Sequence, residues 1–138
     1  MVKVSDKLAA WNVREEEYPS QGSIEEKLKF LLRYAVLAPS GPNTQPWKLS
    51  QRGSRVSVLA DFSRALPKVD PNHRTLYMSN GCLLTNLLVA AEHFSFGYDV
   101  DYLPDGVDAD RIATVDFKEK GMAKNFPDLF NQITNRRS

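Results

Sequence analysis

Residues 39–47 read P-S-G-P-N-T-Q-P-W and stand between the two most regular patterns of this sequence. Residues 39–46 hold three prolines and one glycine, so the backbone there has few accessible conformations. Apolar residues recur in steps of three and four before this stretch, and they alternate with polar residues after it. The stretch is therefore predicted to be a loop of restricted shape between a helix and a strand.

The pattern before the loop predicts a helix over residues 23–38. Ser23 and Glu26 have the spacing of a capping box, in which each side chain bonds the backbone amide of the other residue. Pro39 ends the helix, since proline disfavours helical geometry in the residue before it. One apolar stripe follows the cap and consists of Ile24, Leu28, Leu31, Leu32, Ala35 and Val36.

The pattern after the loop predicts a β-hairpin over residues 47–60. Trp47 and Leu49 alternate with polar residues, and Val56, Val58 and Ala60 do the same. Residues 51–54, Gln-Arg-Gly-Ser, are a turn signal between the two runs.

A long helix is predicted from Asp70-Pro71 to about Phe96, ending at Gly97. Its apolar residues cover more than one face, which predicts burial on most sides or a subunit interface. Apolar residues that alternate with polar ones predict two further strands, which begin near Tyr98 and near Ala113. A short helix is predicted to begin at Phe126-Pro127. Helices and hairpins that alternate irregularly predict an α+β fold in which an antiparallel sheet packs with long helices.

The composition is that of one globular domain over residues 1–138, with an irregular extension over 1–22. Apolar residues make up 42% and charged residues 25% of the 138 residues, and the formal net charge is +1. This charge balance argues against a nucleic-acid or membrane-surface protein. A single cysteine, Cys82, excludes an internal disulfide or a multi-cysteine zinc site, and no metal site is expected. The polar N-terminus and the lack of a long apolar run predict a cytoplasmic protein.

The loop carries neutral polar side chains at the end of the predicted helix. Ser40, Asn43, Thr44 and Gln45 supply hydroxyls and amides, and the prolines lower the entropy cost of presenting them. Such a cluster suits the polar edge of a flat heterocycle. The alternative is a structural loop with polar caps.

Residues 32–47 resemble the A-P-S-x-x-N-x-Q-P-W signature of the FMN-dependent nitroreductase superfamily. Residues 64–87 follow the pattern R-x-L-P-x-x-D-P-x-x-R-x-L…S-x-G-x-x-x-x-N-L, and residues 134–138 read T-N-R-R-S. These stretches resemble the N-terminal half of the internally duplicated, Acg-like branch. Gly41-Pro42 departs from the Ser-His frequent in that branch, and the sequence stops where a second half is expected, as in a short form or a fragment.

The resemblance implies an FMN-dependent oxidoreductase that passes electrons from NAD(P)H to a nitroaromatic or quinone-like acceptor. The cofactor carries the chemistry in such enzymes, so no catalytic side chain is expected. The implied flavin-ring contacts are Pro39, Ser40, Gly41 and Asn43, with Gln45 supporting the loop. The implied phosphate contacts are Arg136, Arg137 and Ser138, for which a solvated basic tail is the alternative.

Two other functions remain open. The protein is either a flavin-binding or flavin-sequestering protein without turnover, or a ligand-free half-domain that acts through dimerisation. A homodimer is predicted, because the apolar residues of the helix over 71–96 exceed one stripe.

Other residues are expected to be structural. Trp47 is predicted to be buried against the helix over 23–38, and Cys82 to be an inert core thiol. His73 is expected at the surface, and His93 is expected to interact with the last carbonyls of its helix.

Overall fold

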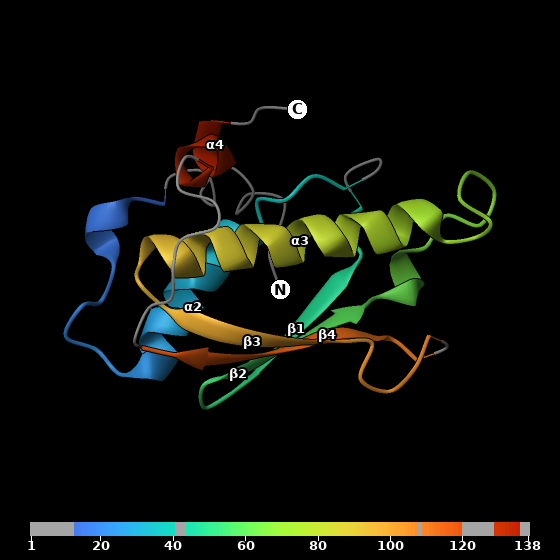
Figure 1. Ribbon diagram of the computed structural model, residues 1–138. Coiled ribbons are helices and arrows are strands. Elements are labelled where there is room, and N and C mark those ends of the chain that lie inside the picture. The colour runs from blue at the N-terminus through green and yellow to red at the C-terminus, as the bar shows by residue number, and fades with distance from the viewer. Residues whose placement is uncertain (1–12, 41–43, 108, 120–128, 136–138) are drawn as a thin grey trace.

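The computed structural model describes residues 13–40, 44–107, 109–119 and 129–135 (Figure 1). Their strands form an antiparallel sheet in the order β1-β2-β4-β3, and their helices lie on one face of it. The elements are η1 (Glu15–Glu17), α2 (Ile24–Ala35), β1 (Trp47–Arg52), β2 (Arg55–Ala60), η2 (Phe62–Arg64), α3 (Arg74–His93), β3 (Gly97–Tyr102), β4 (Arg111–Lys118) and α4 (Phe130–Asn135). The predicted α+β class is confirmed.

Helix α2 begins as its sequence predicts. The Ser23 Oγ accepts a bond from the Glu26 amide at 3.2 Å, and the Ser23 amide donates to Glu26 Oε1 at 3.3 Å. The α-helix ends at Ala35, three residues before the expected end at 38. The amides of Leu37 and Ala38 instead bond carbonyls three residues back, which is the tighter 3₁₀ spacing common at helix ends.

The predicted hairpin is confirmed as β1 and β2. Arg52 pairs with Arg55, so the turn consists of Gly53 and Ser54 alone. Gly53 has a φ of 58°, a left-handed conformation that glycine adopts without a steric penalty. Strand β1 lies at one edge of the sheet and β3 at the other.

Helix α3 begins at Arg74 rather than at Pro71, which corrects the expected start. His73 has a φ of 59°, so the backbone leaves the right-handed helical region just before the helix. Asp70 nevertheless caps the helix, because its carboxylate accepts bonds from the amides of Thr75 at 3.1 Å and Leu76 at 3.0 Å. A turn over residues 70–73, in which His73 alone has a left-handed φ, thus separates the capping side chain from the helix it caps.

The end of α3 is also earlier than expected. The helix ends at His93, and Ser95 takes a left-handed φ of 67°. The Phe96 amide bonds the Ala91 carbonyl at 2.8 Å and the Ser95 amide bonds the Glu92 carbonyl at 3.1 Å, which together form a Schellman motif. Gly97, the expected stop, is the first residue of β3.

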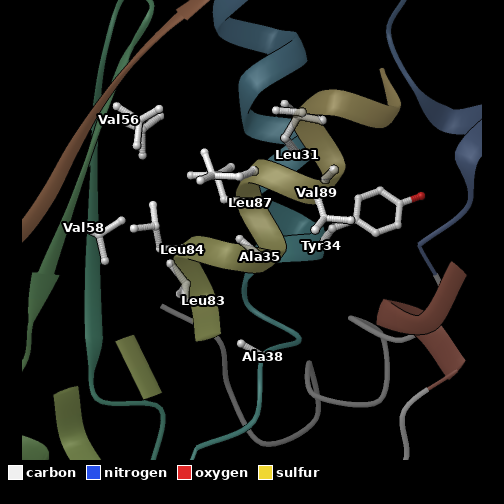
Figure 2. Close-up of a cluster of buried hydrophobic side chains, with 14 of the residues drawn as sticks. Leu31, Tyr34, Ala35, Ala38, Val56, Val58, Leu83, Leu84, Leu87 and Val89 are labelled. Carbon is white, nitrogen blue, oxygen red and sulfur yellow. The ribbon is translucent and has the colours of Figure 1, made fainter. Parts of the chain in front are cut away.

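The core lies between the sheet and helices α2 and α3. Figure 2 shows Leu83, Leu84 and Leu87 of α3 between the β2 valines and the side chains of α2. Helix α4 packs on α3 away from the sheet (Figure 1). The apolar residues of α3 are therefore largely covered within one chain, and their burial does not require a second copy. Within the described ranges, no helix is long and apolar enough to cross a membrane.

Candidate functional site

Residues 44–47 are fixed by hydrogen bonds to two other parts of the chain. The Pro46 carbonyl accepts from Asn80 Nδ2 at 3.0 Å and from the Asp61 amide at 2.9 Å. The Thr44 carbonyl accepts from an Arg64 guanidinium nitrogen at 3.1 Å. The segment is thereby attached to α3 on one side and to the residues after β2 on the other.

The structure brings two of the predicted cofactor-binding residues together. The Ser40 hydroxyl accepts a hydrogen bond from the Gln45 backbone amide at 2.9 Å. Gln45 has a φ of 49°, an uncommon left-handed conformation for this residue type. Pro39 is exposed at the same end of α2. The other predicted contacts lie outside the described residues: Gly41, Asn43, Arg136, Arg137 and Ser138.

A buried carboxylate, Asp61, organises the side chains next to this segment. It accepts from the Ser63 amide at 3.1 Å and from the Ser63 hydroxyl at 2.5 Å. Arg64 Nε lies 3.6 Å and Lys48 Nζ 4.0 Å from its oxygens. The Ser63 hydroxyl, together with the Ser63 amide and both cations, holds the pKa of Asp61 below its ordinary value despite burial. The carboxylate is therefore ionised at neutral pH.

Two cavities flank residues 44–47. The smaller has a volume of about 270 Å³ and the larger about 530 Å³. Arg64 lines both of them. The smaller is lined by Thr44, Pro46, Arg64, Ala65, Leu66, Val69, Asp70, Thr75 and Leu76, and the larger by Val36, Gln45, Trp47, Lys48, Leu49, Asp61 and Arg64. The larger falls within the range typical of small-molecule sites.

Sequence reasoning gave no role to two asparagines of α3 that support this region. Asn80 is fully buried and donates to the carbonyls of Pro46 and Leu76, while its Oδ1 has no hydrogen-bond partner among the described residues. Asn86 donates to the Tyr34 carbonyl near the end of α2 at 3.4 Å. The available signal was an amide side chain inside an otherwise apolar helical pattern.

The remaining expectations are met in part. Trp47 packs against the core but is only half-buried, because one side of it lines the larger cavity. Cys82 is a free, half-buried thiol packed against the core. The expectation for His93 is wrong: its ring stacks on Phe130 with centroids 3.7 Å apart, and its Nε2 pairs with Glu15.

Sequence comparison finds relatives that are much longer than this chain. A protein of Mycobacterium tuberculosis named "Putative NAD(P)H nitroreductase" is 31% identical over 90 residues, which are 65% of this chain and 26% of that protein. The chain thus spans about a quarter of the length of the curated relatives that it matches. No family model matches the sequence.

Solved structures share the fold at low sequence identity. A nitroreductase-like protein of Streptococcus mutans has a TM-score of 0.58 and 13% identity, covering 88% of this chain and 91% of that one. A nitroreductase of Desulfovibrio desulfuricans, solved in complex with FMN, has a TM-score of 0.55 and 17% identity. The match covers 86% of this chain and 90% of that one. The chain therefore shares the fold of these nitroreductase-like structures, and over 65% of its length it resembles part of the mycobacterial relative.

Proposed function

We propose that this chain provides part of the FMN site of a flavin oxidoreductase of nitroreductase type. The observation that carries the proposal is the position of residues 44–47, where the Gln45 backbone amide donates a hydrogen bond to the Ser40 hydroxyl at the end of α2. Three further bonds fix the Thr44 and Pro46 carbonyls, and both residues line the cavity of about 270 Å³. A rigid segment next to a cavity presents polar groups to a ligand at a low entropy cost.

The chemistry of the residues fits a flavin. The hydroxyl of Ser40 and the amides of Asn43 and Gln45 can donate and accept, as the alternating carbonyl and N–H edge of an isoalloxazine requires. Pro39 and Gly41 complete the proposed ring contacts. The proposed phosphate contacts, Arg136, Arg137 and Ser138, combine two guanidinium groups with a hydroxyl, which suits a phosphate dianion.

Bound FMN would supply the hydride and electron transfer, and the residues named above would hold and orient its ring. The electron donor in this proposal is NAD(P)H, and the acceptor is a small nitroaromatic or quinone-like molecule. The supporting facts are the name of the mycobacterial relative and the FMN in a structural neighbour. A cytoplasmic homodimer of the Acg-like branch is part of the same proposal.

The test is an FMN titration of the full chain, followed by absorbance during addition of NADPH. Quenched flavin fluorescence at micromolar FMN, followed by loss of the yellow absorbance, is the expected result. Binding without bleaching would instead identify a flavin-binding protein without turnover. A colourless dimer that stays flavin-free at excess FMN would contradict the proposal and favour the ligand-free half-domain.

A further inference from the structure

The larger cavity has one apolar side and one charged side. Trp47 and Leu49 lie on the helix-facing side of β1, and Val36 lies at the end of α2. Ala60 is the register partner of Trp47, so a small side chain stands opposite the indole. Because the indole is half-buried and faces the cavity, it offers a flat surface on which another ring can stack.

The charge that a ligand would meet in this cavity is positive. The Lys48 side chain is 68% exposed and that of Arg64 is 38% exposed, whereas the Asp61 side chain is only 10% exposed. The Asp61 carboxylate is already bonded by the amide and the hydroxyl of Ser63. The buried carboxylate thus lies beside the two cations, and the cations carry the accessible charge.

Arg64 is fixed in place on the boundary between the two cavities. One guanidinium nitrogen bonds the Thr44 carbonyl at 3.1 Å, and Nε lies 3.6 Å from Asp61. Lys48 follows Trp47 in β1, so its side chain starts from the face of the strand opposite to the indole, and its Nζ lies 4.0 Å from the same carboxylate. Two cations from different elements therefore converge at the rim of a cavity whose wall is aromatic.

We propose that this cavity binds a planar aromatic ring that carries an anionic group, with the ring on Trp47 and the anion at Lys48 and Arg64. An aromatic carboxylate has both features, and one benzene ring with a nitro and a carboxyl group fits about 530 Å³. This inference rests on the proposed function where it identifies the ligand as the electron acceptor. The binding step itself depends only on the described residues.

The experiment compares two probes that differ in charge. Binding of 4-nitrobenzoate and of neutral 4-nitrobenzyl alcohol to the full chain is measured by calorimetry, with and without FMN. Wild type is expected to prefer the carboxylate about three- to fivefold, the range of a partly exposed ion pair. The preference is expected to shrink at about 0.5 M salt, where exposed charges are screened.

Two lysine variants locate the effect. Lys48→Gln is expected to reduce the preference for 4-nitrobenzoate, because only Arg64 then remains, while Lys29→Gln, on the exposed face of α2, leaves it intact. Trp47→Leu is expected to weaken both probes alike. Circular dichroism shows whether that variant folds. If it does not, the comparison of Lys48→Gln with Lys29→Gln still tests the inference.

The outcomes separate this inference from the proposed function. Equal affinity of wild type for both probes, no binding of either, or the same loss in both lysine variants would overturn the inference. Charge-selective binding by a chain that never binds FMN would support the cavity and contradict the flavin site. If the chain binds reducible FMN but shows no preference between the two probes, the flavin site is supported and the inference about the cavity is contradicted.

Discussion

Asp61 determines the local order around residues 44–47, and its ionisation links stability to pH. Its folded-state pKa is lowered, chiefly by the Ser63 hydroxyl, so its ionised form stabilises the folded state. This contribution is complete above the ordinary value of 3.8 and is lost as the pH falls through the lowered pKa. Asp61→Asn should cost about 1–3 kcal/mol at pH 7.

Urea unfolding of wild type and Asp61→Asn at pH 7 and at about pH 2 measures this effect. The difference between the two proteins should shrink at the acidic pH, because protonation of Asp61 removes the charge that the asparagine lacks. Asp101→Asn, on the exposed part of β3, is the matched control and should change little. A difference that is the same at both pH values would show that ionisation of Asp61 is irrelevant.

Asn43 tests the flavin proposal at a single residue. Asn43→Ala should leave the fold intact, because residues 44–46 are fixed by Asp61, Arg64 and Asn80. It should weaken FMN binding by about 1–3 kcal/mol if a polar ring edge loses its partner. Flavin fluorescence titration measures this, with Asn131→Ala on the exposed side of α4 as the control. Equal affinities of wild type and Asn43→Ala would move the flavin away from this loop.

Asn80 shows why part of the site could not be predicted. Ser40 and Gln45 are only five positions apart, so a local sequence pattern is enough to group them. Asn80 acts on Pro46, which is 34 positions away, and only the packing of α3 against the loop brings them together. Local patterns carry no information on such a pairing.

At the scale of elements, the sequence predicted which helices and strands are present better than it predicted the residues at which they begin and end. The capping box of α2 and the hairpin turn are local, so both were predictable. The ends of α3 depend on left-handed residues, His73 and Ser95, that are not glycine. Such residues are held by tertiary context and give no signal of their own.

Ser95 provides the test at this scale. It occupies the left-handed position of the Schellman motif, where glycine avoids the steric penalty of a Cβ. Ser95→Gly should therefore stabilise the protein by about 0.5–1 kcal/mol. Ser50→Gly, on the exposed face of β1 and outside any left-handed turn, should destabilise it instead. Thermal unfolding of both variants checks this, and a destabilised Ser95→Gly would contradict the argument.

At the scale of the whole molecule, the order of elements predicted an α+β fold, but not how completely one chain covers α3. The sheet, α2 and α4 bury most of its apolar residues, whereas periodicity alone could not say which elements supply the cover. The apolar residues left exposed near its start are Tyr77, at 37%, and Met78, at 61%. A homodimer that uses α3 must therefore use this exposed end.

Met78→Lys tests that consequence. A charge there should disrupt an apolar contact between two copies while leaving the core unchanged, since Met78 faces outward. The wild-type solution mass should be twice 15.6 kDa at micromolar concentration, and the variant mass 15.6 kDa, with matching unfolding curves. Lys68→Met, a reverse change at another exposed position, is the control and should leave the mass of a dimer unchanged. A wild-type mass of 15.6 kDa would make the homodimer proposal wrong, and a dimeric Met78→Lys would place its interface away from this end of α3.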